Sequence, residues 1–269
     1  MDQSKLEITL NGSTRLHIIV GDPIAQVKSP FGMTKALVAR GENALVVPIH
    51  VSPADLSNLL TNVAFAKNLD GIIVTVPHKF ACYAHCAETS DRARFLETVQ
   101  IMRRRQAGGW YGENFDGVGF VRAAISKGAA LKGARALLVG AGGAGSAIAL
   151  ALLEAGVREL AVHDADIARR DKLIERLKGA AKVPVITGSD NPSGYDFVGN
   201  ATPMGMREGD PLPFDPTDLK SSTFVGCVIT APLVSPIAQI ARDKGCKTSV
   251  GVDMYAAVQE LMLEFLAAK

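Results

Sequence analysis

The chain has 269 residues, of which 48% are hydrophobic and 21% are charged, and its formal net charge at pH 7 is only +2. This composition is typical of a soluble globular protein with one or two domains, and it excludes global disorder. Because the charge is nearly balanced, it argues against nucleic acid or an anionic membrane as the partner. A small-molecule ligand is expected instead.

The amino-terminal sequence MDQSKLEITL lacks the basic and then apolar pattern of a signal peptide. The most apolar stretch, residues 136–155, is interrupted by the glycines of GAGGAG and is not predicted to span a membrane. The four cysteines are too few for a disulfide framework in a chain of this length and suit a reducing compartment. We therefore expect a cytoplasmic protein, either a monomer or a homodimer.

Short apolar runs alternate with helical stretches in the amino-terminal part of the chain. The runs at 16–20, 44–50 and 71–77 are predicted to be strands, because they are apolar and rich in β-branched residues. Helices are predicted at 29–37, with Ser29 as the N-cap and Pro30 just inside, at 53–66, and from Lys79 onward. This alternation is typical of α/β proteins with parallel sheets.

A glycine-rich stretch at 108–120, GGWYGENFDGVGF, is expected to form a hinge between domains. The pattern beyond it predicts a further alternation of elements. The predicted elements are a helix after the hinge, strands at 136–139, 159–163 and 195–199, and helices at 146–155 and 254–268.

Gly140, Gly142 and Gly145 form a GxGxxG pattern between a predicted strand and a predicted helix, which is the context in which this pattern binds a dinucleotide. The first glycine permits a tight turn, the second lets the backbone approach a pyrophosphate, and the third lets helix and strand pack closely. The start of the helix offers free N–H groups to the phosphates. A plain glycine-rich turn is the alternative. The expected cofactor contacts here are Gly140, Ala141, Gly142, Gly143, Ala144 and Gly145.

Asp164 follows the second strand of this region, nineteen positions after Gly145. An acidic residue at about this spacing of 20 binds the ribose 2′-hydroxyl and repels a 2′-phosphate, and Asp166 adds to the repulsion. Arg169 and Arg170 are expected on the surface of the following helix. The sequence therefore predicts NAD rather than NADP, and an N-cap role for Asp164 is compatible with this prediction.

Six segments occur in the order GDPIAQVKSP, VTVPHK, GENFDGVGF, VGAGGAG, NATPMGM and GVDM. Together they resemble the shikimate dehydrogenase family, from about Gly21 to Phe265. The resemblance implies two α/β domains with the active site in the cleft, and reversible oxidation of the 3-hydroxyl of shikimate or quinate with a nicotinamide cofactor. It implies a substrate-binding domain of residues 1–107, to which 237–269 return, and a Rossmann-type domain of residues 108–236.

The resemblance identifies Lys79, which ends the VTxPxK pattern, and Asp116, the aspartate of the GxNTDxxG pattern, as the catalytic pair. Oxidation of a secondary alcohol requires a group that accepts the hydroxyl proton. The reference lysine pKa of about 10.4 is too high for a base at neutral pH; desolvation lowers it and a carboxylate raises it. The role of base is therefore not assigned to Lys79 alone: Asp116 either orients Lys79 or shares the proton with it. A surface position for Lys79 and a turn role for Asp116 are the alternatives.

The resemblance also implies ligand contacts at other matching positions. The substrate contacts would be Ser29, Thr75, Gln100, Asn114 and Gln259. The further cofactor contacts would be Asn200, Ala201, Thr202, Met206, Val228, Gly251 and Met254.

Several of these positions depart from the family pattern. The S-x-S-P loop reads Val27-Lys28-Ser29-Pro30, and the G-A-V-N-T segment reads Glu97-Thr98-Val99-Gln100-Ile101. The glutamine expected four residues after Met254 is Val258, with Gln259 one residue later. A lost hydrogen bond to a charged group is worth about 1.5–3 kcal/mol. The departures therefore predict an altered or weakly bound substrate, such as quinate or an aminoshikimate-type compound, and Lys28 offers a charge for a carboxylate.

His78, Cys82, His85 and Cys86 share one face of a predicted helix, but they extend along about 12 Å of it. Four ligands on one straight helix do not surround a zinc ion tetrahedrally, so no metal site is predicted. Two other functions remain open: a non-catalytic NAD sensor, and a dehydrogenase for an unrelated hydroxy acid. Hydride transfer to or from a polyol acid would separate the sensor from the enzymes.

Overall fold

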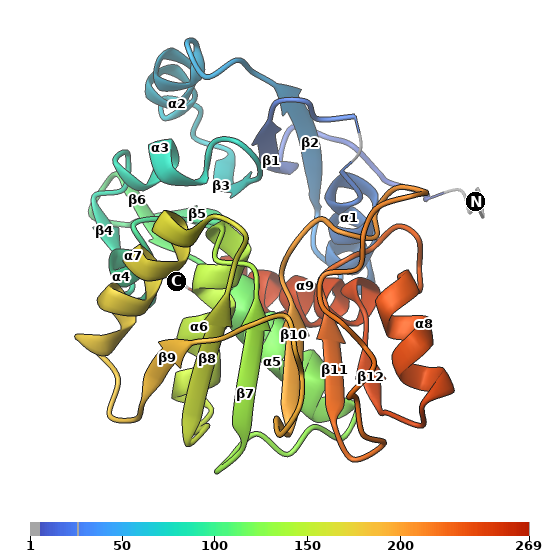
Figure 1. Ribbon diagram of the computed structural model, residues 1–269. Helices are drawn as coiled ribbons and strands as arrows, with labels where there is room; N and C mark the ends of the chain where they lie inside the picture. Colours follow the sequence, from blue (N-terminus) through green and yellow to red (C-terminus); the bar gives the residue numbers. More distant parts are fainter. Residues whose placement is uncertain (1–5, 26, 269) are drawn as a thin grey trace. The chain divides into compact units, whose positions relative to one another are not determined.

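The computed structural model describes residues 6–25 and 27–268. They form two compact units: the first contains the described residues up to Asn114 and from Leu261 onward, and the second is Phe115–Glu260. Each unit is built on its own six-stranded sheet with helices (Figure 1). The α/β class with a Rossmann-type unit and a second α/β unit is therefore confirmed.

The sheet of the first unit is mixed, with the strand order β2-β1-β3-β5-β6-β4. Its strands are β1 (Arg15–Gly21), β2 (Ala44–His50), β3 (Leu69–Val74), β4 (Glu88–Thr89), β5 (Ile101–Arg104) and β6 (Trp110–Glu113). β1 is parallel to β2 and β3, whereas β5 is antiparallel to both β3 and β6. The helices are α1 (Ser29–Ala39), α2 (Leu56–Val63), α3 (Lys79–Tyr83) and α4 (Asp91–Leu96).

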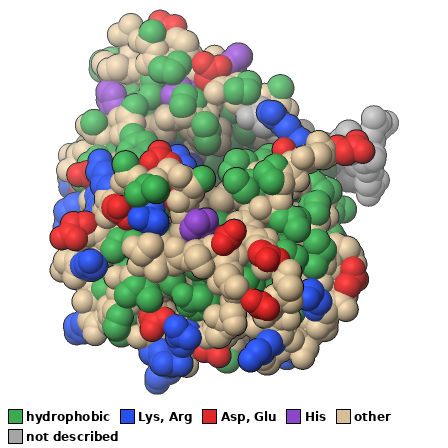
Figure 2. Space-filling view, in the orientation of Figure 1, with side chains coloured by type: hydrophobic (Ala, Val, Ile, Leu, Met, Phe, Trp, Pro, Cys, Tyr) green, Lys and Arg blue, Asp and Glu red, His purple; other side chains and the backbone are tan. Residues whose placement is uncertain are grey.

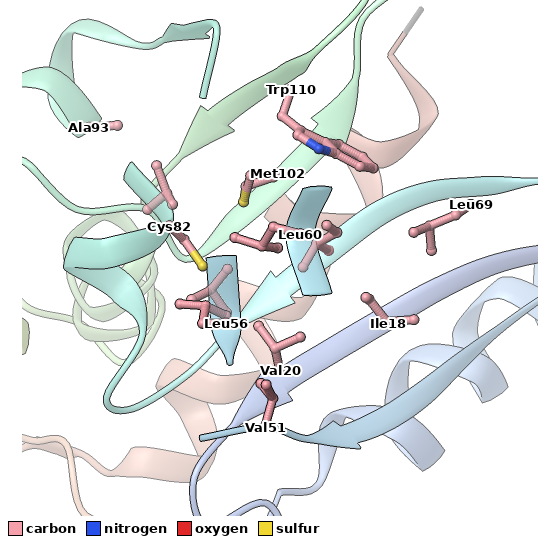
Figure 3. Close-up of a cluster of buried hydrophobic side chains, with 13 residues drawn as sticks. Ile18, Val20, Val51, Leu56, Leu60, Leu69, Cys82, Ala93, Met102 and Trp110 are labelled. Carbon is pink, nitrogen blue, oxygen red and sulfur yellow. The ribbon is translucent and has the colours of Figure 1, made fainter. Parts of the chain in front are cut away.

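One face of this sheet carries a buried apolar cluster (Figure 3). Leu56 and Leu60 from α2 reach the strand residues Ile18 and Val20, and Cys82 from α3 is fully buried in the same cluster. Burial of apolar side chains is the main favourable term in folding. The cluster therefore anchors the short helix α3 and the loop that carries it.

The sheet of the second unit is entirely parallel, with the strand order β12-β11-β10-β7-β8-β9. The strands are β7 (Arg135–Val139), β8 (Glu159–His163), β9 (Val185–Thr187), β10 (Phe197–Asn200), β11 (Phe224–Cys227) and β12 (Thr248–Ser249). The helices are α5 (Asp116–Ser126), α6 (Gly143–Glu154), α7 (Ile167–Lys178), α8 (Pro236–Asp243) and the first part of α9 (Gly251–Ala267), whose residues from Leu261 onward belong to the first unit. The direction of strand succession reverses between β7 and β10, where dinucleotides bind in such sheets.

Two glycines let α5 approach its neighbours closely. A Cβ on Gly117 would lie 2.0 Å from the carbonyl oxygen of Ala147 in α6, and a Cβ on Gly119 would lie 2.2 Å from the side chain of Val258 in α9. Neither space admits even a methyl group. These contacts fix where α5 begins relative to α6 within the second unit.

The observed division of the chain differs from the predicted boundaries after residues 107 and 236. The chain passes from the first unit to the second between Asn114 and Phe115, within the stretch 108–120 that was expected to be a hinge. That stretch also holds β6, which pairs with β5 of the first sheet, and the start of α5. The strand was missed because glycine content outweighed the strand signal of Trp110 and Tyr111. At the other boundary, α8 packs on β11 and β12 of the second sheet.

Other local predictions needed correction. Ser29 is the first residue of α1 and not its cap, because Lys28 takes the N-cap position without a side-chain bond. The helix predicted at 53–66 is confined to α2, and the helix from Lys79 ends at Tyr83. Within the described part of the chain, every helix is too short or too polar to cross a bilayer.

Candidate active site

The first unit gathers four of the five predicted substrate residues at one edge of its sheet. Ser29 begins the helix that follows β1, and Thr75 directly follows β3, so both lie beyond the carboxyl ends of parallel strands. The N–H of Thr75 donates to the carbonyl oxygen of Val20 in β1 at 3.1 Å. This edge is where parallel sheets present ligand-binding loops.

Gln100 and Asn114 reach the same edge from the antiparallel strands. Gln100 precedes β5, and its carbonyl oxygen accepts a 2.7 Å bond from the N–H of Val74 at the end of β3. Its own N–H donates at 2.8 Å to the carbonyl oxygen of Glu113, the last residue of β6. Asn114 follows immediately. Both Gln100 and Asn114 are buried, at 8% and 1% exposure.

Lys79 is the first residue of α3 and is half-buried. Its carbonyl oxygen accepts a 3.1 Å bond from the N–H of Val99, which ties α3 to the segment that leads to Gln100. The preceding His78 is 1% exposed and its Nε2 lies 2.9 Å from the carbonyl oxygen of Val51. Buried polar and apolar neighbours thus hold the backbone around Lys79.

The second unit builds a glycine cradle at the carboxyl end of β7. Gly140 has φ +107°, and a Cβ on Gly145 would lie 1.9 Å from its carbonyl oxygen. Gly142 and Gly143, at the start of α6, have nothing within 4 Å of an added Cβ. The loop is therefore closely packed at Gly140 and Gly145 and open at Gly142 and Gly143, which lets a pyrophosphate approach the backbone N–H groups. The loop therefore fits the pyrophosphate of the nicotinamide dinucleotide that is expected from the sequence.

Asp164 lies directly after β8 and is 7% exposed. Its carboxylate accepts bonds from the N–H groups of Ala141 at 2.7 Å and Asp166 at 2.8 Å, and from Nη2 of Arg169 at 2.7 Å. Burial acts to raise the pKa of Asp164, but these hydrogen bonds outweigh it and hold the pKa below its ordinary value. The carboxylate is thus ionised and fixed against the glycine loop, while Asp166 caps α7 through the N–H of Arg169.

The remaining predicted cofactor residues occupy neighbouring strand ends in the second unit. Asn200 ends β10 and accepts bonds from the N–H and hydroxyl of Thr202 at 2.9 and 2.7 Å. Val228, after β11, donates its N–H to the carbonyl oxygen of Asn200 at 3.1 Å. Gly251 begins α9, and Met254 follows in the same helix. Met206 is an exception, because it is 52% exposed in the loop beyond β10.

Asp116 is the first residue of α5 and is 6% exposed, at a helix end that favours negative charge. On α9, the position where the family pattern places glutamine is Val258, which packs on Gly119. Gln259, the next residue, is half-buried. Lys79 belongs to the first unit, whereas Asp116 and Gln259 belong to the second.

A shallow pocket in the second unit adjoins the end of β8. His163, Asp190, Met204 and Asp215 line it, and its described lining contains neither lysine nor arginine. Figure 2 shows acidic side chains close to a histidine on the visible face of the second unit, with lysine or arginine side chains nearby.

The helix that was predicted to carry His78, Cys82, His85 and Cys86 does not extend through all of these residues. α3 ends at Tyr83, so His85 and Cys86 lie beyond it. His78 is committed to the carbonyl oxygen of Val51, and Sγ of Cys86 lies 3.5 Å from the carbonyl oxygen of Cys82. Among the described residues, no group of three or more His, Cys, Asp or Glu side chains is placed to hold a metal ion.

Sequence reasoning missed residues that act on the predicted ones. Arg169 is exposed, as predicted, but its pairing with Asp164 at the end of β8 was not foreseen. Thr98 and Glu113 both bond Asn114, although neither was a candidate. Two weak signals in the sequence could have revealed these contacts. One is the spacing of Asp164 and Arg169, and the other is that Glu113 directly precedes Asn114, a predicted site residue.

Residues 19–102 match the family model described as the shikimate dehydrogenase substrate binding domain. A shikimate dehydrogenase (NADP(+)) from Rubrobacter xylanophilus is 34% identical over 241 residues, which cover 88% of this chain and 84% of that protein. Quinate dehydrogenase from Corynebacterium glutamicum in complex with NAD is 28% identical, with a TM-score of 0.85 and coverage of 94% of each chain. A structure of shikimate 5-dehydrogenase from Listeria monocytogenes with shikimate and NAD shares the fold, with 23% identity, a TM-score of 0.90 and coverage of 98% of this chain and 95% of that one.

Proposed function

The chain belongs to the shikimate dehydrogenase family, and we propose that it transfers hydride reversibly between NAD and the 3-hydroxyl of shikimate or a related cyclic hydroxy acid. As a member of this family it is an oxidoreductase that acts on CH–OH groups with a nicotinamide cofactor. The observation that carries the proposal is the gathering of Thr75, Lys79, Gln100 and Asn114 at one sheet edge.

Lys79 and Asp116 are proposed to handle the proton. When the alcohol is oxidised, the hydride leaves the carbon, the hydroxyl proton passes to the lysine–aspartate pair, and the C–O bond becomes a carbonyl. The bound nicotinamide supplies the hydride acceptor, or the donor in the reverse direction. On reduction, the pair returns the proton to the oxygen.

The preference for NAD rests on Asp164 and its surroundings. Gly140–Gly145, Asp164, Asn200–Thr202, Met206, Val228, Gly251 and Met254 are the residues proposed to hold the dinucleotide. An ionised carboxylate at the end of β8 accepts from a ribose hydroxyl and repels a 2′-phosphate. Arg169 gives that phosphate little attraction, because its guanidinium already pairs with Asp164. Relatives differ in this respect, since the Rubrobacter enzyme is named for NADP and the Corynebacterium structure holds NAD.

We propose that the substrate differs from shikimate, or that the protein binds shikimate itself only weakly. Ser29, Thr75, Gln100, Asn114 and Gln259 are the proposed substrate contacts. Where the family loop supplies two serines, only Ser29 remains, and Lys28 is exposed beside it. Quinate retains the ring hydroxyls that these residues would bind, and an aminoshikimate-type compound carries an amino group in place of one of them.

Steady-state assays with shikimate, quinate and an aminoshikimate, each with NAD and NADP at equal concentration, test the proposal. We expect kcat/KM with NAD to exceed that with NADP about tenfold or more, a difference of about 1.4 kcal/mol. A preference for NADP would overturn the cofactor assignment. A shikimate KM below about 1 mM with a high kcat would overturn the altered substrate. NAD binding without any hydride transfer would instead indicate a sensor.

A further inference from the structure

Two hydrogen bonds from different partners hold Asn114, which is 1% exposed. Its backbone N–H donates to Oε1 of Glu113 at 2.7 Å. Its side-chain Nδ2 donates to Oγ1 of Thr98 at 2.8 Å. Since Thr98 and Glu113 are also buried, at 4% and 8% exposure, water competes little for these bonds. The main chain and the amide of Asn114 are therefore fixed separately.

Both partners are anchored by α4. Oε1 of Glu113 also accepts a 2.7 Å bond from Oγ of Ser90, the N-cap of α4, and that hydroxyl accepts from the N–H of Ala93 at 3.0 Å. Thr98 lies beyond the other end of the helix, and its N–H donates to the carbonyl oxygen of Ala93 at 3.3 Å. The two ends of one short helix thus support the two bonds to Asn114.

The turn that places Thr98 departs from the family pattern. Glu97 ends α4 in the left-handed region, with φ 53° and ψ 33°. Glycine, which the pattern has at this position, adopts that conformation without steric cost, whereas other residues disfavour it. Thr98 stands where the pattern has alanine, and alanine carries no hydroxyl. An alanine at this position could not accept the hydrogen bond that Thr98 accepts from Asn114.

The bond to Thr98 also sets the orientation of the Asn114 amide. An asparagine amide has a donor end and an acceptor end. Because Nδ2 is turned toward Thr98, Oδ1 is directed away from it. An oxygen acceptor suits a ligand hydroxyl or amino group and repels a carboxylate. The orientation thus selects the kind of group that Asn114 binds.

We propose that Thr98 and Glu113 are positioning residues, which hold Asn114 so that its Oδ1 accepts a hydrogen bond from a substrate hydroxyl or amino group. The inference rests on the proposed function, in which Asn114 contacts the substrate. A ring hydroxyl that does not react is bound similarly in the ground state and the transition state. Its loss therefore raises KM while kcat changes little.

The test compares Thr98→Val, which keeps the branched shape, with Thr98→Ser, which keeps the hydroxyl. With shikimate and quinate as probes, Thr98→Val is expected to raise KM about 3- to 10-fold, with kcat within about twofold, because one hydrogen bond is lost. Thr98→Ser is expected to stay within about twofold of the wild type. In an Asn114→Ala background, Thr98→Val should have no further effect, as two residues that act through one contact are not additive.

An equal KM for Thr98→Val and the wild type would overturn the proposal. So would a Thr98→Ser variant as impaired as Thr98→Val, or a Thr98→Val effect that persists in the Asn114→Ala background. A parallel NMR measurement on the wild type and Thr98→Val follows the side-chain amide protons of Asn114, and slower solvent exchange in the wild type is expected. If the wild type oxidises neither acid, the proposed function is wrong, and so is the inferred hydrogen bond between the substrate and Asn114. The amide exchange then still decides whether Thr98 holds Asn114.

Glu113 is tested by removing its carboxylate without touching Asn114. Glu113→Gln retains an oxygen that accepts from Ser90 and from the Asn114 N–H, and should leave KM within about twofold. Ser90→Ala removes one partner of Glu113, whose Oε1 also lies 3.5 Å from Nη1 of Arg92. A rise in KM of about 2- to 5-fold is expected from one lost bond. The reverse order, with Glu113→Gln impaired and Ser90→Ala normal, would contradict the role given to Glu113.

Discussion

The cofactor edge of the second unit and the substrate edge of the first unit are built in different ways. Around the glycine cradle, the decisive contacts involve backbone atoms: the carbonyl oxygen of Gly140 beneath Gly145, and the N–H of Ala141 on Asp164. Around Asn114, they involve side chains from α4 and its flanks. A backbone-built site keeps its ligand while the surrounding sequence changes. A side-chain-built site changes its ligand with a few substitutions.

The largest expected effect would come from removing the proton-handling pair. Lys79→Ala and Asp116→Ala should each lower kcat about 10²- to 10⁴-fold, the usual contribution of a general acid or base. NADH binding, followed by fluorescence titration, should survive in both variants because neither residue belongs to the glycine cradle. A near-normal kcat in either variant would show that the substituted residue takes no part in the proton transfer.

The next largest effect is expected at the tightest backbone contact of the cradle. Gly145→Ala would place a methyl group 1.9 Å from the carbonyl oxygen of Gly140, so the loop must shift. We expect weaker NADH binding by about tenfold or more, and a loss of about 1–3 kcal/mol in the free energy of unfolding. Gly143→Ala is the matched control, since nothing lies within 4 Å of its added Cβ. Equal melting temperatures for the two variants would show that the backbone of the cradle tolerates a side chain at position 145.

A smaller effect is expected at Asp164, whose side chain is fixed against the glycine cradle. Asp164→Ser removes the charge that opposes a 2′-phosphate and releases Arg169 from its ion pair. The ratio of kcat/KM for NAD over NADP should fall about tenfold, or about 1.4 kcal/mol. The same assays on Asp166→Ser provide a control on the neighbouring charge. An unchanged ratio in Asp164→Ser would mean that the cofactor is selected elsewhere.

The smallest effect concerns the cysteines beneath the substrate edge. Burial raises the pKa of Cys82 and Cys86 to about 12. Only the thiolate is nucleophilic, so both residues should resist alkylation at pH 7.5 and react only after unfolding. Mass spectrometry after iodoacetamide treatment of native and denatured protein measures this directly. Rapid modification of Cys82 in the native protein would show that the apolar cluster around α3 opens.

The regular parts of the fold were predictable from the sequence because their signals are local. The apolar runs before the glycine motif and before Asp164 became β7 and β8, and the motif itself became the start of α6. The run at 71–77 became β3, although the strand ends at Val74. Apolar periodicity and glycine spacing act over a few residues, so a single sequence displays them.

The supports of the site were not predictable, because they join residues from separate short elements. Ser90 and Glu113 are 23 positions apart, and Thr98 and Asn114 are 16 apart. Neither pair has a spacing that signals contact. The strand β6 around Trp110 was missed because its pairing with β5 depends on a partner strand that sequence periodicity does not reveal.

The central claim is that an ammonium and a carboxylate from different units meet at the reacting hydroxyl. A crystal structure with NAD and shikimate or quinate bound tests it most directly. We predict that Nζ of Lys79 and a carboxylate oxygen of Asp116 each lie within hydrogen-bond reach of the hydroxyl, at about 2.6–3.2 Å. A ternary complex in which protein separates either group from that hydroxyl would contradict the account.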